Sequence, residues 1–376
     1  MATNLSTIPA AMRSLAIRTY TKPSGYEVLD LPVPTITNPN DVLVRVHAAV
    51  IATRDTQFAG GMTRYIAPLK FPFRLSVRGS GVIAAIGSKV TSLKIGDPVY
   101  GISSRHGHLM HREVSFASDY VVVPADILVI KPANLSFEEA ATLSASVLVA
   151  YQCVRLYFEM TGQPAESTLE GKTVFVPGAL SATGSVGVQV AKNVFGASNV
   201  ISTVSTAKLG LVEELLGKGV VDQVIDYRTE NVMDAVGRGA VDFVYNTQWD
   251  LVGTFPLVKP DTGAIVSIAS VPSSGMMRSM FGPNRGFILG LMGWVSDLVY
   301  MYYGWKLRGT NIKQDFLSGN PGVREDVERT GEWIAAGKIK AVMTVVELDD
   351  IEKVREACDK VATGKGGLGA LVIKLV

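Results

Sequence analysis

The chain has 376 residues, of which 47% are hydrophobic and 19% are charged, and its formal net charge is +2. At about 150 residues per domain, this length and composition indicate a globular protein of two domains with ample cores. The near-neutral charge and the lack of a basic run argue against a partner selected by charge, and we expect no nucleic acid.

The N-terminal residues and the cysteines bear on the compartment. Residues 1–26 contain Arg13, Arg18 and Lys22 but no acid, a pattern that faintly resembles a mitochondrial presequence. The segment 15–20 already alternates like a strand, which leaves only about ten residues for a presequence. Cys153 and Cys358 have no CxxC neighbours, so neither a disulfide framework nor a zinc knuckle is predicted. We therefore expect a reducing compartment, the cytoplasm.

Short alternating strands separated by Pro and Gly turns fill residues 12–125. They read SLAIRTY, DVLVRVHAAV, GSGVIAAIG, DPVYGIS and DYVVVPAD. Strands at such spacing predict a largely antiparallel, barrel-like domain.

The pattern changes at about residue 137. A helix is predicted from Phe137 to Arg155, and Ser136 with Glu139 forms a capping box before it. Strands then alternate with helices through FVP, VISTV, QVIDY, FVYN and AIVSI. This alternation predicts a doubly wound parallel sheet, so the fold class is α/β.

A glycine-bearing turn follows the first of these strands, Thr173 to Val176. Gly178 releases the chain into the turn, and Gly184 and Gly187 lie on one face of the next helix. The backbone of that helix can then approach the sheet while its N-terminal amides face an anion such as a pyrophosphate. The usual dinucleotide fingerprint has glycine where this chain has Ser181 and Ala182. The alternative is that the glycines serve only close packing.

The second strand ends in hydroxyl groups and a lysine. An NAD site would place Asp or Glu there to accept bonds from the ribose 2′-OH, but this chain has Ser205, Thr206 and Lys208. Hydroxyl donors and an ammonium group suit a 2′-phosphate, which predicts NADPH. The alternative is that Lys208 is an ordinary solvated surface lysine.

An apolar segment extends from Phe287 to Trp305. It is long enough to suggest a membrane span, but Asp297 near its middle and three glycines argue against one. We expect it to cover a pocket or a subunit contact, and attachment to one face of a membrane is the alternative. The surrounding Met and aromatic residues suit a bulky apolar substrate, although such residues also form ordinary cores.

The C-terminal segment alternates helix and strand: a helix over 324–336, MTVVEL, a helix over 351–362, and GALVIKLV. No third core is evident, so this segment is expected to return to the N-terminal domain, and the two domains are expected to enclose a cleft. The predicted boundaries are 1–150 for the catalytic domain, 151–315 for the nucleotide-binding domain with an insert at about 272–305, and 316–376 for the return.

The ordered set of motifs resembles the medium-chain dehydrogenase/reductase superfamily, in particular its zinc-free quinone oxidoreductase-like and enoyl reductase-like branch. The resemblance covers nearly the whole length, from LAIRTYTKPSGYEVLDLPVP through IGSKVTSLKIGDPVYG, the cofactor turn and VVDQVIDY to GKGGLGALVIKLV. It implies a GroES-like catalytic domain beside a Rossmann domain, and a homodimer.

The resemblance also implies site residues for the cofactor. Residues matching Ser181, Ala182 and Thr183 line the pyrophosphate turn, and those matching Ser205, Lys208 and Tyr227 approach the 2′-phosphate. Tyr227 could instead only cover the sheet edge. The cofactor-binding set that we predict is Ser181, Ala182, Thr183, Gly184, Ser205, Lys208, Tyr227 and Asn246.

The chain departs from the zinc alcohol dehydrogenases. Ala52 stands in place of their first cysteine, and Ser76, Val77 and Arg78 replace their Gly-His-Glu. A catalytic zinc site needs three protein ligands, so no metal is predicted. The structural-zinc cysteines are replaced by ISSRHGHLMHREVSF, whose histidines, His106, His108 and His111, are better explained as a solvated loop than as a chelate.

The substrate pocket also departs from the reductase branch. Of its Asn-Pro-x-Asp stretch only Asp55 remains, and a tyrosine two residues later is Gln57 here. Tyr65 is the predicted hydrogen-bond donor to a developing enolate, and Gln57 could polarise the carbonyl group. With Asp55, these residues form the predicted catalytic set Tyr65, Gln57 and Asp55. Two of them have a plain alternative: Tyr65 as a packed loop aromatic, and Asp55 as a turn cap.

These observations predict an NADPH-dependent, zinc-independent reductase of the activated C=C bond in an enone, enoyl or quinone-like substrate. Two alternatives stay open. In one, the fold has lost redox activity and serves binding, cyclisation or elimination. In the other, the protein is a membrane-attached regulator that uses the segment from Phe287 to Trp305.

Overall fold

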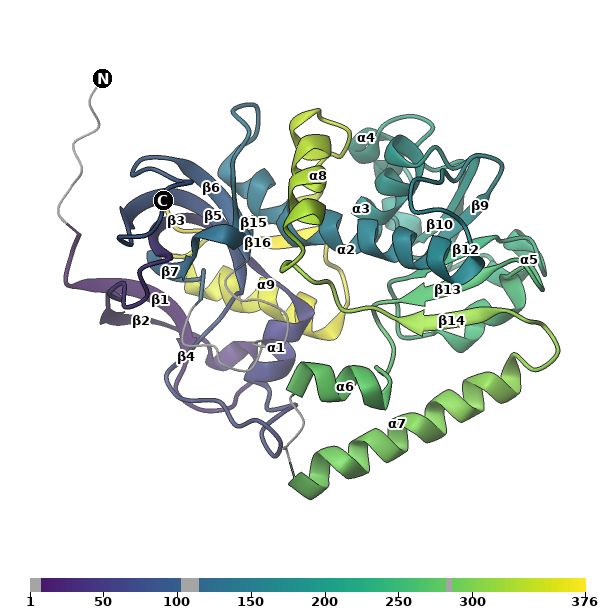
Figure 1. The fold of residues 1–376 in the computed structure, drawn as a ribbon, viewed down its shortest axis with the longest axis horizontal. Coiled ribbons are helices and arrows are strands. Elements are labelled where there is room, and N and C mark those ends of the chain that lie inside the picture. The colour runs from purple at the N-terminus through teal and green to yellow at the C-terminus, as the bar shows by residue number, and fades with distance from the viewer. Residues whose placement is uncertain (1–7, 103–114, 282–285) are drawn as a thin grey trace. The chain divides into compact units, whose positions relative to one another are not determined.

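The computed structural model describes residues 8–102, 115–281 and 286–376. The chain divides into two compact units (Figure 1). Unit 1 comprises residues 1–145, 321–331 and 343–376, and unit 2 comprises residues 146–320 and 332–342.

Unit 1 is built on two β-sheets. The smaller sheet is antiparallel, in the order β2 (Glu27–Pro32), β1 (Ala11–Ile17), β4 (Phe73–Arg74). The larger follows the order β15 (Met343–Glu347), β16 (Ala370–Lys374), β3 (Asp41–Ile51), β5 (Arg78–Ile86), β6 (Pro98–Ile102), β8 (Leu128–Ile130), and β7 (Tyr120–Pro124) also pairs with β3. Among these pairs only β15 with β16 is parallel. The expected largely antiparallel domain is confirmed.

Strand β3 is the centre of the larger sheet. It pairs with β5 along one edge, and its other edge is divided between β7, opposite residues 41–45, and β16, opposite residues 48–51. Its apolar side chains are almost all buried, as expected for a strand with neighbours on both edges. Helices α1 (Thr53–Ala59) and α9 (Ile351–Thr363) also belong to unit 1 and contact each other.

Unit 2 holds a six-stranded sheet in which every pair is parallel. Its order is β11 (Gln223–Asp226), β10 (Asn199–Val204), β9 (Thr173–Val176), β12 (Phe243–Asn246), β13 (Ala264–Ser267), β14 (Lys313–Phe316). The chain runs outward from β9 in one direction and then returns to β12 on its other side. This is the order of a dinucleotide-binding doubly wound sheet. The strand order across the sheet reverses between β9 and β12. The predicted parallel sheet is confirmed.

Helices connect these strands within unit 2. They are α3 (Gly184–Gln189), which continues through a π-helical turn at Val190–Val194, then α4 (Leu211–Leu216), α5 (Val232–Val236), α6 (Ser274–Phe281) and α7 (Gly286–Lys306). The insert expected at 272–305 is therefore a helical pair between β13 and β14 (Figure 1).

Two helices cross the boundary between the units: α2 (Phe137–Thr161) and α8 (Arg324–Ala335). The predicted capping box of α2 is confirmed, because Ser136 N donates to Glu139 Oε2 at 2.8 Å and Glu139 N donates to Ser136 Oγ at 3.1 Å. Among the described residues, α2 alone is long and apolar enough to cross a membrane, and 67% of its most apolar window is buried. Such burial is typical of a core helix.

The C-terminal return differs from the prediction in two segments. Residues 316–320 and 332–342 belong to unit 2, whereas all of 316–376 was expected to join the catalytic domain. Gln189 explains the second segment, since its amide accepts from Lys340 N at 2.7 Å and donates to Lys340 O at 2.9 Å. Asn193 Nδ2 adds a bond to Lys338 O at 2.8 Å. Polar side chains on the helical segment after the cofactor turn thus hold the returning chain.

Candidate functional site

The turn after β9 requires glycine. Gly178 has φ of 77°, in the left-handed region that other residues avoid. Thr203 on β10 holds the turn in place, since its Oγ1 accepts from Gly178 N at 3.0 Å and its carbonyl oxygen accepts from Ala179 N at 3.0 Å. The turn is therefore fixed by the neighbouring parallel strand.

The helix that follows packs closely on the sheet. A Cβ atom on Gly184 would lie 2.1 Å from the carbonyl oxygen of Gly178, and one on Gly187 would lie 2.6 Å from the ring of Tyr245 on β12. Ser181 Oγ accepts from Gly184 N at 3.0 Å and so caps the first turn. Close packing of the glycines is thus real, and the same arrangement places the positive end of the helix dipole at the carboxyl edge of β9, where phosphate groups bind in this fold.

The residues predicted to bind the 2′-phosphate lie at the ends of β10 and β11. These strands pair in register up to Val204 and Asp226, and Tyr227 N donates to Val204 O at 3.1 Å. Ser205 is therefore brought beside Tyr227, whose side chain is exposed. Lys208 ends a 3₁₀ turn over Thr206–Lys208, where its side chain is half-buried.

Sequence reasoning missed two charged residues at this edge. Arg228 is exposed, and its guanidinium carbon lies 5.5 Å from the centre of the Tyr227 ring, which adds a second cation to the ends of β10 and β11. Asp226 accepts from Thr206 Oγ1 at 2.6 Å and from Arg228 N at 3.0 Å. Its bond from Thr206 holds the pKa of this carboxyl below its usual range. The sequence signal was an acid near the end of the predicted strand QVIDY and an arginine directly after it.

Asn246 ends β12 and is fully buried. Its Nδ2 donates to Gln248 O at 2.7 Å and to Ser267 Oγ at 3.0 Å, and its Oδ1 accepts from Gln248 N at 3.3 Å. The amide is thus engaged within unit 2, where it holds the loop after β12. Thr247 on that loop donates to Pro177 O at 2.6 Å, next to the cofactor turn.

Three predicted catalytic residues lie in unit 1, on α1 and the turns after it. Asp55 is buried, and its Oδ2 accepts from Ala52 N at 2.9 Å, which caps the start of α1. Gln57, two residues further along α1, is half-buried. Tyr65 is 71% exposed, and Arg64 donates to its hydroxyl oxygen while lying 4.4 Å above its ring. Tyr65 is therefore not a packed loop aromatic.

The positions that hold zinc in related dehydrogenases carry the wrong atoms for zinc. Ala52 and Val77 offer no ligand, and Arg78 is a buried cation whose pKa is lowered by burial. Ser76 Oγ lies 2.9 Å from the carbonyl oxygens of Val50 and Arg78, so its hydroxyl is already engaged in hydrogen bonding. These residues do not fit a zinc ion. In the described part of the chain no cluster of three His, Cys, Asp or Glu side chains could hold a metal, and His106, His108 and His111 lie outside it.

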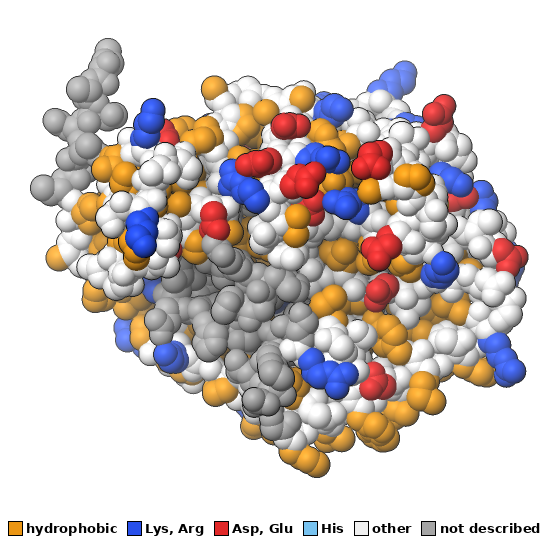
Figure 2. All heavy atoms as spheres, viewed as in Figure 1, with side chains coloured by type: hydrophobic (Ala, Val, Ile, Leu, Met, Phe, Trp, Pro, Cys, Tyr) orange, Lys and Arg blue, Asp and Glu red, His pale blue; other side chains and the backbone are white. Residues whose placement is uncertain are grey.

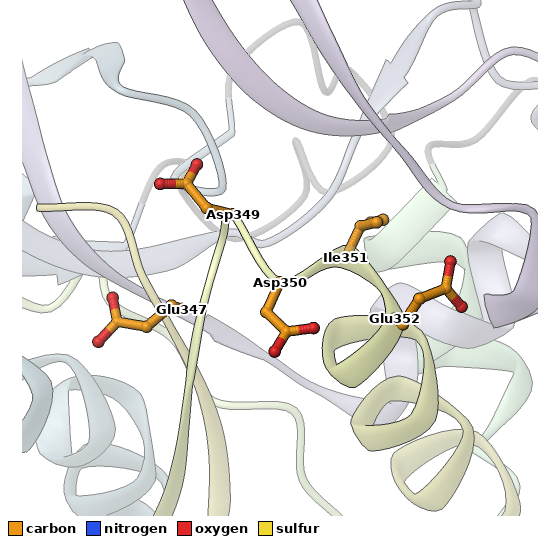
Figure 3. A pocket seen from close by; sticks show the side chains of 5 residues that line it. All are labelled: Glu347, Asp349, Asp350, Ile351 and Glu352. Carbon is orange, nitrogen blue, oxygen red and sulfur yellow. The ribbon is translucent and has the colours of Figure 1, made fainter.

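An acidic surface pocket lies at the start of α9, and its lining includes no predicted site residue (Figure 3). Its carboxylates are paired: Glu347 with Lys374 at 3.0 Å, Asp349 with Arg13 at 2.5 Å, and Asp350 with Lys353 at 2.7 Å. Neutralised in this way, the pocket offers no candidate site.

Comparisons with known proteins agree with this arrangement. The family models described as alcohol dehydrogenase GroES-like domain and zinc-binding dehydrogenase match residues 38–133 and 221–367. A relative named 2-methylene-furan-3-one reductase, from Solanum lycopersicum, is 31% identical over 71% of this chain and 65% of its own length. An Arabidopsis thaliana protein named NADPH-dependent alkenal/one oxidoreductase is 31% identical over 66% of this chain and 59% of its own length.

Among solved structures, the quinone oxidoreductase from Coxiella burnetii covers 97% of this chain and all of its own, with a TM-score of 0.72 and 21% identity. At that identity the likeness shows the fold alone. The two curated relatives are matched over only 59% to 65% of their own length. The matched domains, the strand order and the cofactor turn together establish that the chain belongs to the medium-chain dehydrogenase/reductase superfamily of oxidoreductases.

Proposed function

We propose that this protein is an NADPH-dependent, zinc-independent reductase that transfers hydride to the activated C=C bond of an enone, enoyl or quinone-like substrate. The proposal rests on the set of cationic and hydroxyl side chains at the ends of β10 and β11, next to the glycine turn. The names of the two curated relatives support the substrate class, since both name reductases or oxidoreductases of conjugated carbonyl compounds.

The residues of unit 2 fit the cofactor. The turn over Ser181, Ala182 and Thr183 would face the pyrophosphate, as the helix dipole favours. Gly184 would let this turn lie close to the strand, and its own amide donates to Ser181 Oγ. Ser205, Lys208 and Tyr227, together with Arg228, would bind the 2′-phosphate through charge-assisted bonds. When bound, NADPH supplies the hydride. Asn246 and Thr247 hold the neighbouring loop against Pro177.

On the substrate side, Tyr65 is the proposed donor. Because Arg64 donates to the hydroxyl oxygen of Tyr65, the hydroxyl hydrogen can be directed to a substrate oxygen as negative charge develops on it. Gln57 is proposed to polarise the same carbonyl through its amide. Asp55 is proposed to act by holding the start of α1, because its carboxylate accepts the Ala52 amide.

The test is oxidation of NADPH by the full chain in the presence of a panel of enones, enals and quinones, followed by absorbance. Turnover with at least one class is expected, and Tyr65→Phe should lower kcat for an enone about tenfold or more while leaving NADPH affinity unchanged. Tight NADPH binding without turnover of any panel member would instead favour the alternative in which redox activity has been lost.

Cofactor preference is tested separately, by calorimetry with NADPH and NADH. Lys208→Ala and Arg228→Ala should each weaken NADPH binding by about threefold to tenfold, a modest effect for partly exposed cations, and should leave NADH binding unchanged. Lys218→Ala, on the same unit but beyond α4, is the matched control. Equal affinity of the wild type for both cofactors would refute the phosphate assignment.

We also propose a homodimer and a reducing, cytoplasmic compartment. Cys153 and Cys358 are both buried thiols, and burial raises the pKa of Cys358 to about 12, so neither is reactive in this fold. Such thiols require no oxidising compartment.

A further inference from the structure

Helix α7 is more apolar on its outside than on the face that packs against its own unit. Its inner face presents Leu289, Gly293, Ser296 and Tyr303, all buried. Ser296 Oγ donates to Pro272 O at 2.5 Å, and Tyr303 packs edge-on against Phe255 at 5.8 Å between ring centres. The helix is thus fixed to unit 2 by a narrow stripe that includes a glycine and a serine.

The outer face of α7 is exposed and hydrophobic up to Lys306, the last residue of the helix. Phe287 is 85% exposed, Met301 69%, Trp305 64% and Trp294 59%. The remaining exposed apolar side chains of this face are Ile288, Leu291, Met292, Val295, Leu298 and Tyr302. Hydrophobic side chains are visible along the edge of unit 2 where α7 lies (Figures 1 and 2). A helix on the surface of a water-soluble protein shows the opposite pattern, with its polar side outward.

The width of the outer face indicates what covers it. At 100° per residue, the exposed apolar side chains from Met301 to Met292 span about 180° of the circumference. A helix packed on a second protein surface buries a stripe about 100° wide. A second copy of the chain would therefore leave part of this face in water, whereas a fluid lipid surface closes around a half-embedded helix.

The charges agree with a lipid surface. Among described residues of α6, α7 and the turn after them, the charged side chains are Arg278, Asp297, Lys306 and Arg308, all exposed. The one acid, Asp297, lies about 130° from the middle of the outer face and would remain in water. Lys306 lies 5.6 Å from the ring centre of Tyr302 and 5.2 Å from that of Trp305, a grouping of aromatic rings and a cation that suits the headgroup region.

We propose that α7 lies in the plane of a lipid bilayer surface, with its outer face in the boundary between headgroups and acyl chains and its cations toward anionic headgroups. The helix rests on the bilayer and does not span it, since Ser296 and Tyr303 hold its other side against unit 2. This attachment is independent of the proposed reductase activity.

The test is co-sedimentation of the full chain with large unilamellar vesicles of phosphatidylcholine and phosphatidylserine at 70:30. Wild type should pellet with the vesicles, and less of it should pellet with phosphatidylcholine alone. The triple variant Trp294→Ser, Leu298→Ser, Trp305→Ser should bind about tenfold more weakly or worse, because three exposed anchors are lost. Trp249→Ser, which removes an exposed tryptophan elsewhere on unit 2, should bind as wild type.

Fluorescence supplies a second readout. In a background with Trp249→Phe and Trp333→Phe, which leaves only Trp294 and Trp305, vesicles with brominated acyl chains should quench the remaining tryptophan emission. Failure of wild type to bind either vesicle would overturn the proposal. So would a wild-type dimer that becomes a monomer in the triple variant with no vesicle binding by either, since a second copy would then cover α7. NADPH binding by the triple variant should be unchanged, which separates this test from that of the proposed function.

Discussion

At the scale of single residues, Ser76 links two strands of unit 1 at a position where related enzymes hold a metal. Ser76 has φ of 71°, a left-handed conformation that costs a residue with a side chain roughly 1–2 kcal/mol. Its hydroxyl lies 2.9 Å from the carbonyl oxygens of Val50 and Arg78, and it is buried. One side chain therefore links the end of β3 to the start of β5 at the expense of backbone strain.

Two substitutions separate these effects. Ser76→Ala keeps the strained φ and loses the hydroxyl, so the free energy of unfolding should fall by roughly 1–3 kcal/mol. Ser76→Gly loses the same hydroxyl but removes the strain, so its loss should be smaller. Denaturant unfolding measures both. If the glycine variant were the less stable of the two, the strain argument would be wrong.

His47 gives stability a dependence on pH. Burial lowers its pKa below the ordinary 6.5, the charge of Arg45 lowers it further, and Glu138 opposes them. The His47 ring stacks on the Phe137 ring, with 4.1 Å between ring centres, and Lys131 Nζ lies 5.1 Å from the centre of the Phe137 ring. The folded state therefore favours neutral His47.

Stability from His47 should be fully present above about pH 6.5 and should be lost as the pH falls from there towards the lowered pKa of the folded state, because the unfolded chain takes up the proton first. Unfolding of wild type and His47→Gln across this range checks the sign. The difference in unfolding free energy between them should shift in favour of the variant as the pH falls. Parallel curves would show that another group governs this range.

At the scale of elements, the sequence pattern located most strands and several helices closely. Thr173–Val176 and Phe243–Asn246 are strands with the bounds expected, because β-branched and apolar runs fill central parallel strands. Helix α1 was not expected, since seven residues show too little periodicity. Helix α7 was expected only as an apolar cover, because a helix that is hydrophobic on most sides has no period to detect.

The site was predictable to the same extent. Gly178, Gly184 and Lys208 could be found from their order along one strand, turn and helix. Arg228 and the bond between Thr206 and Asp226 could not, because they depend on the register of β10 with β11, which no local pattern contains.

The packing of α3 on the sheet yields a sharp test. Gly187→Ala would place a methyl group 2.6 Å from the ring of Tyr245, which is buried, so the free energy of unfolding should fall by about 1–3 kcal/mol. Gly290→Ala is the matched control in an exposed part of α7, with no atom within 4 Å of the new methyl group. It should stabilise the protein by about 0.5–1 kcal/mol through helix propensity. Thermal unfolding that ranked the two in the reverse order would contradict this packing.

At the scale of the whole molecule, the chain passes between the two units four times, after residues 145, 320, 331 and 342. The eleven residues 332–342 belong to unit 2, and their place there depends on Gln189, a fully buried side chain that pairs with both backbone groups of Lys340. Neither unit is one continuous piece of chain.

Gln189→Leu preserves volume but leaves the amide and carbonyl groups of Lys340 without their partner. The free energy of unfolding should fall by roughly 1–3 kcal/mol, and hydrogen exchange at Ile339 and Lys340 should accelerate. Asn193→Ala, which removes one exposed bond to Lys338, should have a smaller effect. Unchanged exchange in Gln189→Leu would mean that other contacts hold this segment.

The pairing of β3 with β16 has a consequence for biosynthesis. Leu371 to Lys374 lie opposite Ile51 to Ala48, so during synthesis the central strand of unit 1 lacks half of one edge until residues more than three hundred positions later have emerged. For most of translation, that strand exposes unsatisfied amides and carbonyls to whatever else is nearby. Newly made chains should consequently depend on chaperones that shield nascent β-edges, and a stop codon placed before β16 should yield an aggregating product rather than a smaller folded one.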